Sequence, residues 1–279
     1  SLLWNNIQPR FVDIDPVTLN LNPGKIEAAI TPNTTAIMPV HVYGQPCDVD
    51  AIDVIAKRYN LKVIYDAAHA FGVQCHCGSI LNHGDLSALS FHATKVFNTF
   101  EGGAVVSQTQ EMKEHVDRLK NFGFEDEVSV TQVGINGKMN ELSAALGLLQ
   151  LEQIDQDIEK RKLIDATYRD ALSDLAGIRC HEPPHPEKKN YSYFPIFVEE
   201  AYPLTRDELY ERLKANGING RRYFYPLITD FQMYKSMNET SSEALPIAKN
   251  AAEQVICLPI YSDLSAADAN RIVDVIVMQ

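Results

Sequence analysis

The chain has 279 residues, of which 45% are hydrophobic and 22% are charged. This balance is typical of a globular protein with a large core, and it excludes a disordered chain, a collagen-like repeat and a small disulfide-stapled scaffold. The formal net charge of -12 argues against a nucleic acid as the main partner, because an acidic surface repels phosphate backbones.

Targeting signals are not expected. Residues 1–20 contain no basic segment followed by an apolar run, and no stretch approaches the roughly 18 uninterrupted apolar residues that a membrane span needs. The five cysteines are scattered and odd in number, which favours a reducing compartment. We therefore expect a cytoplasmic protein that binds neither membrane nor nucleic acid.

Cysteine spacing does not indicate a metal site. Cys75 and Cys77 are too close in sequence for a CxxC pair, and no second Cys/His pair stands out at ligand spacing. From spacing alone, no metal is expected.

The first half of the chain alternates strand and helix patterns. Apolar runs and alternation predict strands at residues 10–15, 36–40, 62–65, 86–91 and 104–107. Helices are expected after the Asn22-Pro23 cap to residue 30, after Asp48 or Asp50 to residue 59, and at residues 112–122. Strands separated by such helices predict βαβ units around a mainly parallel sheet with helices on both faces.

The second half has a different character. Apolar residues at helical spacing from 140 to 175 predict one long helix or a broken pair, which is a natural connector between domains. Beyond a Pro-rich loop, a strand is expected at residues 191–198 and helices at 206–216, 246–254 and 266–278. We predict a large domain over residues 1–150, and over residues 151–279 the connecting helix with a smaller α/β domain.

Two charged residues each follow a predicted strand. Ligands of open α/β sheets bind beyond the carboxyl ends of the strands, where Asp66 and Lys95 fall. A carboxylate buried there needs a cationic partner, although Asp66 could equally cap a helix. A partly desolvated lysine can form a Schiff base with a carbonyl, whereas most lysines are simply solvated.

Other candidate residues are less specific by themselves. Ser90 and His92 add a hydroxyl and an imidazole beside Lys95, and His69 could be either functional or a core histidine. Asn136 and Lys138 precede the long helix, where a loop can bind an anion or can serve only to cap the helix.

Arginines beside aromatic residues form a further candidate. Arg222 and Tyr225 lie in the segment RRYFYP, which suits a carboxylate or phosphate on a small anionic substrate, or is a surface pair.

Five ordered motifs resemble the sugar aminotransferases of the DegT/DnrJ/EryC1/StrS family. They are VHVYGQP at residues 40–46, DAAHAFG at 66–72, SFHATK at 90–95, EGGA at 101–104 and GINGKMNE at 134–141. The resemblance implies the α/β fold of pyridoxal-phosphate (PLP) enzymes of fold type I, with PLP as cofactor and a smaller C-terminal α/β domain.

The resemblance also implies roles for residues in the cofactor site. Lys95 matches the lysine that bonds to the cofactor and then moves a proton. Asp66 matches the carboxylate on the pyridinium nitrogen, Ala68 the small residue under the ring, and His69 a residue near the ring hydroxyl. Ser90 matches a phosphate ligand.

Further implied contacts involve a second subunit and the substrate. Asn136 matches a residue that reaches the phosphate of the neighbouring subunit, with help from Lys138, so a homodimer with shared active sites is expected. His92, Arg222 and Tyr225 are the expected substrate contacts.

The implied reaction moves an amino group from glutamate to a nucleotide-linked keto-deoxysugar. The form of the motifs looks most like the viosamine-type branch, which aminates C4 of dTDP-4-keto-6-deoxyglucose for cell-surface polysaccharide or antibiotic sugars. Lys95 favours amination over dehydration, because the family's dehydratases have a histidine at that position.

Two alternatives stand beside this interpretation. Family members carry a further segment before the position of Ser1, so we expect the N-terminal part of the large domain to be missing; a non-catalytic domain that binds only a partner or cofactor is then the alternative. A nucleotide-binding oxidoreductase would need a Gly-rich fingerprint after the first strand, which residues 11–22 lack.

Overall fold

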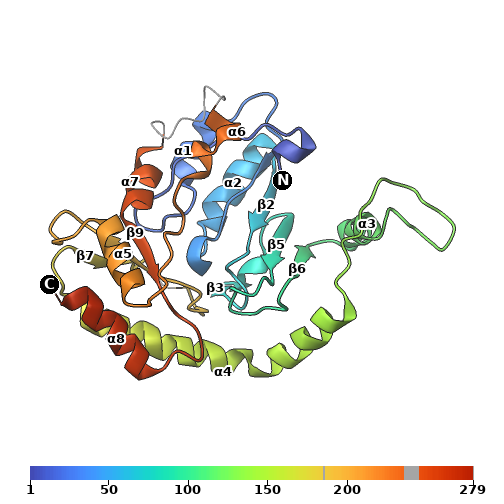
Figure 1. Ribbon diagram of the computed structural model, residues 1–279. Helices are drawn as coiled ribbons and strands as arrows, with labels where there is room; N and C mark the ends of the chain where they lie inside the picture. The colour runs from blue at the N-terminus through green and yellow to red at the C-terminus, as the bar shows by residue number, and fades with distance from the viewer. Residues whose placement is uncertain (185, 236–244, 279) are drawn as a thin grey trace. The chain divides into compact units, whose positions relative to one another are not determined.

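A computed structural model describes residues 1–184, 186–235 and 245–278, and it divides into two compact units (Figure 1). Unit 1 comprises Ser1–Thr34, Glu159–Pro184 and Tyr191–Gln279, and unit 2 comprises Thr35–Ile158 and His185–Asn190. This division differs from the boundary predicted at residue 150. The change of unit falls inside the long helix, and the N-terminal segment groups with the C-terminal part of the chain.

Unit 2 is built on a four-stranded sheet in the order β1-β2-β5-β6. Its strands are β1 (Ala36–Ile37), β2 (Lys62–Asp66), β5 (Leu86–Ser90) and β6 (Gly103–Ser107). The pairs β1–β2 and β2–β5 are parallel, whereas β5–β6 is antiparallel. The expected strands and the mainly parallel sheet are therefore confirmed in this unit.

The helices of unit 2 begin at side-chain caps. They are α2 (Val49–Tyr59) and α3 (Gln110–Lys120), with the short turns η2 (Val42–Gly44) and η3 (Ile80–Asn82). Asp48 accepts a hydrogen bond from the Ala51 amide, and this contact identifies Asp48 as the cap of α2. A small antiparallel hairpin, β3 (Gln74–Cys75) and β4 (Gly78–Ser79), completes the unit.

The long periodic segment is a single helix. α4 runs from Glu141 to Leu172 without a break, and Asn140 accepts from the Ser143 amide at its start (Figure 1). The observation selects one long helix over a broken pair. Despite this length, neither α4 nor another helix in the described ranges is apolar enough over a sufficient length to cross a membrane.

Unit 1 contains a three-stranded antiparallel sheet in the order β7-β8-β9, made by β7 (Ile178–Cys180), β8 (Phe194–Val198) and β9 (Val255–Leu258). Its helices are η1 (Leu3–Asn5), α1 (Pro23–Ala29), α5 (Arg206–Ala215), η4 (Ile228–Asp230), α6 (Gln232–Lys235), α7 (Pro246–Gln254) and α8 (Ala266–Val277). The predicted helices at 206–216, 246–254 and 266–278 are confirmed to within a residue.

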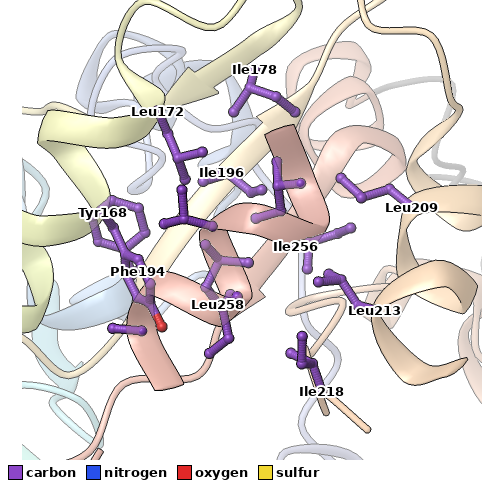
Figure 2. Packing of buried hydrophobic residues seen from close by; sticks show 14 of the residues in the cluster. Tyr168, Leu172, Ile178, Phe194, Ile196, Leu209, Leu213, Ile218, Ile256 and Leu258 are labelled. Atoms are coloured by element: carbon purple, nitrogen blue, oxygen red, sulfur yellow. The ribbon is translucent and has the colours of Figure 1, made fainter. Parts of the chain in front are cut away.

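The core of unit 1 gathers side chains from the sheet and from helices that flank it. Figure 2 shows Ile196, Ile256 and Leu258 of the strands near Leu209 and Leu213 of α5. Tyr168 and Leu172, from the end of α4, belong to the same buried cluster. Every residue of β8 and β9 is buried, as expected of strands covered on both faces.

The predicted strand at residues 10–15 is wrong. Only Ile14 makes an isolated bridge, to Leu21. The side chain of Asp15 accepts the amides of Val17 and Thr18 and closes a turn, so the alternating pattern does not extend into a ladder.

Asp13 explains why the N-terminal segment belongs to unit 1. α7 has no side-chain cap from its own flanking residue. The buried Asp13 carboxylate accepts the amides of Ile247 and Ala248 in its first turn, and it forms an ion pair with Lys25 at 3.0 Å. The helix is therefore capped from the other end of the chain.

We expect Asp13→Asn to lower the free energy of unfolding by about 1–3 kcal/mol at pH 7. Burial alone raises the pKa of Asp13, but the bonds to Ala248, Lys25, Ile247 and Ile14 outweigh it, so the folded pKa lies below the ordinary value of 3.8. The contribution is present above pH 4 and is lost as pH falls through the folded pKa.

Urea unfolding at pH 7 and at pH 3 measures both effects. The matched control is Asp53→Asn, which removes an exposed ion pair with Lys57 and should cost about 0.5 kcal/mol or less. Equal effects of the two variants would contradict the capping role of Asp13.

Candidate active site

The carboxyl ends of two adjacent parallel strands form the edge on which the candidate site is built. Asp66 is the last residue of β2 and Ser90 the last of β5. In the register of the pair, Asp66 lies opposite Ala88, so the two strands end within two residues of one another. The chain segments that leave them, 67–73 and 91–102, both start at this edge.

Lys95 lies in the second of these segments and is half-buried. The segment is folded back on itself, since the Thr99 amide donates to the Phe91 carbonyl and the Ala93 amide to the Phe100 carbonyl. Burial lowers the pKa of Lys95, and the negative charge of Asp66 raises it, with a net lowering. The structure therefore brings Lys95 under the influence of the Asp66 carboxylate.

Two phenylalanine rings of the Lys95 segment, Phe91 and Phe97, pack with Phe71 of the segment that follows β2. Phe71 and Phe97 stack at 4.4 Å between ring centroids, and Phe91 meets Phe97 edge-on at 4.9 Å. Phe97 is buried. Aromatic pairs of this geometry give the segment a rigid apolar base.

Asp66 is held by the backbone that follows it. Its Oδ1 accepts a hydrogen bond from the Ala68 amide at 3.0 Å, and Ala67 continues the ladder by donating to the Ala88 carbonyl. The carboxylate is half-buried. Its orientation is thereby set by two residues of the DAAH motif.

His69 is a buried neutral imidazole. Burial, with the positive charge of Lys95, lowers its pKa to about 3. Its Nδ1 accepts a hydrogen bond from the Tyr43 amide at 3.1 Å, so the ring proton is on Nε2. His69 therefore offers a hydrogen-bond donor through Nε2 at any pH near neutrality.

Ser90 and His92 lie on either side of the strand end. The His92 amide donates to Ser90 Oγ at 3.4 Å, and His92 Nδ1 lies 2.9 Å from Thr94 Oγ1. His92 Nε2 faces a Glu101 carboxylate oxygen at 3.8 Å. Both His92 and Glu101 are exposed, so the imidazole stands at the surface of the site.

The contacts that the structure describes for Asn136 and Lys138 are with residues that follow α3. Among the described residues, Asn136 forms a bridge with Asn121, whose side-chain oxygen accepts from Lys138 Nζ at 2.8 Å. Lys138 also lies over the Phe122 ring, 5.0 Å from its centroid. Both are exposed.

Arg222 and Tyr225 belong to unit 1. Arg222 donates to Asp207 at 2.8 Å, and this hydrogen bond raises its pKa. Its guanidinium lies 4.4 Å from the ring centroid of Tyr210 and 5.6 Å from that of Tyr225. The side chain is thus held in place by a carboxylate and two rings.

Two residues that position the site were not found from the sequence. The buried Asn190 donates to the carbonyls of His69 and Phe71 at 2.8 and 2.9 Å and fixes the turn after Asp66. Tyr43 selects the His69 tautomer through its backbone amide. A backbone amide can donate whatever its side chain is, so the sequence does not indicate this contact. Asn190 lies in a Pro-rich loop that shows no helix or strand periodicity.

Comparison with known proteins gives a family match over almost the whole chain. The sequence model of the DegT/DnrJ/EryC1/StrS aminotransferase family matches residues 1–277. A dTDP-4-amino-4,6-dideoxy-D-glucose transaminase of Shigella dysenteriae is 55% identical over 276 residues, which are 99% of this chain and 75% of the relative.

Solved structures agree with this match. DesI in the presence of its TDP-sugar product superposes with a TM-score of 0.92 at 35% identity, covering 98% of this chain and 69% of the other. DesV of S. venezuelae in complex with a ketimine intermediate gives 0.87 at 31% identity, covering 95% and 70%. The predicted fold, that of fold type I aminotransferases, is confirmed, and a ketimine is chemistry of a PLP-dependent family.

We expect Asp66→Asn to lower the pKa of Lys95 further, because the neutral amide no longer stabilises the ammonium form. Reductive methylation with ¹³C-formaldehyde, followed by NMR titration, reports the pKa of each dimethyl-lysine. Lys95→Arg assigns the signal.

The matched control is Asp85→Asn. Asp85 raises the pKa of Lys62 through a hydrogen bond of 2.7 Å, so this variant should lower the pKa of Lys62 and leave Lys95 unchanged. A Lys95 pKa that does not respond to Asp66→Asn would contradict the coupling.

Proposed function

Because the chain belongs to the DegT/DnrJ/EryC1/StrS aminotransferase family, we propose that it transfers an amino group from glutamate to a nucleotide-linked keto-deoxysugar. The substrate proposed is dTDP-4-keto-6-deoxyglucose, aminated at C4. The name of the Shigella dysenteriae relative supports this choice, since its amino sugar is the corresponding 4-amino compound.

The observation that carries the proposal is a half-buried lysine that feels the charge of a carboxylate at the carboxyl ends of β2 and β5. Lys95 has a lowered pKa and feels the charge of Asp66, and the neutral donor His69 lies within the electrostatic reach of Lys95. Lys95 suits the carbonyl of PLP, Asp66 suits its pyridinium nitrogen, and His69 suits its ring hydroxyl. Ala68 leaves one wall of the site without a large side chain.

Bound PLP would supply a carbonyl and an electron sink. Lys95 provides the amine: partial burial increases its neutral, nucleophilic fraction near pH 7. The same amine can take and return a proton during the transfer, because its pKa lies nearer to neutrality than that of a solvated lysine. Asp66 keeps negative charge where a protonated ring nitrogen needs it.

Phosphate binding is assigned to hydroxyl, amide and ammonium groups. We assign Ser90, at the end of β5, to the phosphate of its own subunit. Asn136 and Lys138 are exposed and are assigned to the phosphate of the neighbouring subunit. Large apolar side chains near them, Val133, Ile135 and Leu142, are also exposed, which supports a homodimer.

Substrate binding is assigned to His92, Arg222 and Tyr225. Arg222 is a fixed cation next to aromatic rings, which suits an anionic group of a nucleotide sugar. In a protein with a net charge of -12, positive charge for such a substrate has to be local.

Lys95→Ala is expected to reduce turnover by more than about 10³-fold while the protein stays folded. In the unchanged chain, PLP titration should give a visible absorption band, and borohydride should fix the cofactor to the peptide that contains Lys95. Lys113→Ala, on the exposed face of α3, is the matched control and should behave as wild type. Undiminished turnover in Lys95→Ala would refute the proposal.

Arg222→Gln is expected to raise KM for the nucleotide sugar by roughly 10-fold or more, because a charge-assisted contact is lost. PLP titration should be unaffected. Arg221→Gln is the control, since Arg221 contacts only Tyr223 among the hydrogen bonds described for its side chain. Equal KM values for the two variants would remove Arg222 from the substrate site.

A further inference from the structure

The β3–β4 hairpin of unit 2 carries a cluster of soft donor atoms that the proposed reaction does not use. Cys75 Sγ and Cys77 Sγ lie 3.2 Å apart. His83 Nε2 lies 3.3 Å from the first sulfur and 3.1 Å from the second. Two sulfurs and one nitrogen thus form a nearly equilateral triangle.

The hairpin geometry brings the two thiols together. Cys75 pairs with Gly78 in the antiparallel ladder, so only His76 and Cys77 connect the strands. Gly78 has φ +109°, a conformation that favours glycine and lets the connection turn this tightly. Both sulfurs therefore project from one tight turn.

A separate anchor brings His83 to the same place. Ile80 is fully buried, and its amide donates to the carbonyl of Val73, the residue directly before β3, which ties η3 to the start of the hairpin. His83 follows η3 directly. The third donor therefore comes from a segment with a fixed position, not from a free loop.

The donor set and its spacing match a transition metal. Zinc binds thiolates at about 2.3 Å and imidazoles at about 2.0–2.1 Å in a tetrahedron, which separates neighbouring donors by roughly 3.3–3.8 Å. The three separations here are 3.1–3.3 Å, so a small outward shift suffices. Hard cations such as Mg²⁺ and Ca²⁺ are disfavoured, because they select oxygen ligands.

We propose that Cys75, Cys77 and His83 bind one Zn²⁺, with His76 as fourth ligand. A nitrogen of the exposed His76 lies within 4.8 Å of both sulfurs, so this imidazole is in reach of an ion that the sulfurs bind. Binding releases the two thiol protons to solvent. The ion closes the hairpin as a structural staple and touches none of the residues assigned to the cofactor.

This geometry differs from the expectation from cysteine spacing, which predicted no metal. In the sequence, Cys75, His76 and Cys77 form a short Cys-His-Cys segment, and no second pair of ligands follows it at a typical spacing. His83 becomes a partner only because η3 returns the chain to the hairpin.

The first test is a cobalt titration of the reduced, chelator-treated full chain. We expect one Co²⁺ per chain, with a sulfur-to-cobalt charge-transfer band and the intense visible bands of a tetrahedral site, both lost when Zn²⁺ is added. X-ray absorption of the zinc form should show two sulfur ligands. Cobalt spectra without sulfur ligation, or no saturable uptake, would overturn the proposal.

Variants locate the site. Cys77→Ser and His83→Gln should each weaken Zn²⁺ binding at least ~100-fold, measured by competition with a chromophoric chelator. Cys77 is exposed, so its variant keeps the fold even if His83→Gln does not. Cys180→Ser and His115→Gln are matched controls outside the cluster and should bind as wild type.

Two outcomes would contradict the assignment. Equal affinity in Cys77→Ser and wild type would show that the ion binds elsewhere. A Cys75–Cys77 disulfide that forms readily and, once reduced, takes up no metal would identify the pair as a redox couple instead.

Discussion

The parallel pairing of β2 with β5 is the constraint on which the candidate site depends. Because of this pairing the two strands end at the same level. Asp66, the last residue of β2, therefore lies at the same end of the sheet as the start of the Lys95 segment, which follows β5. Burial lowers the pKa of Lys95, and the negative charge of Asp66 opposes part of that lowering.

The backbone around this edge is fixed from several directions. Asn190 binds two carbonyls of the turn after Asp66, and Tyr43 holds the ring of His69. Gly44 has φ +81°, and a Cβ there would lie 2.8 Å from Asn190 Oδ1 and 2.9 Å from the His69 carbonyl oxygen. Polar groups that are satisfied in this way pre-organise a site, because no reorientation is needed when a ligand enters.

Distant contacts of the same kind organise unit 1. Asp13 caps α7 from the far end of the chain, and the core joins the end of α4 to β8 and β9. The alternating pattern at residues 10–15 predicted a strand there, yet the aspartates in it bind backbone amides instead. A hydrophobic pattern cannot reveal such a competition, because it does not show which backbone amides are available: Asp15 binds amides in the next turn, and Asp13 binds amides more than two hundred residues away.

The sequence by itself determined the local elements and the identity of the chemistry. Asp48 and Pro23 mark helix starts, apolar runs mark β2 and β5, and the DAAH and HATK segments point to a lysine and a carboxylate at strand ends. Only the tertiary structure decided which groups meet: Asn190 with His69, Asp13 with α7, and His83 with Cys75. Local patterns are set by neighbouring residues, whereas these contacts depend on loop paths that no periodicity encodes.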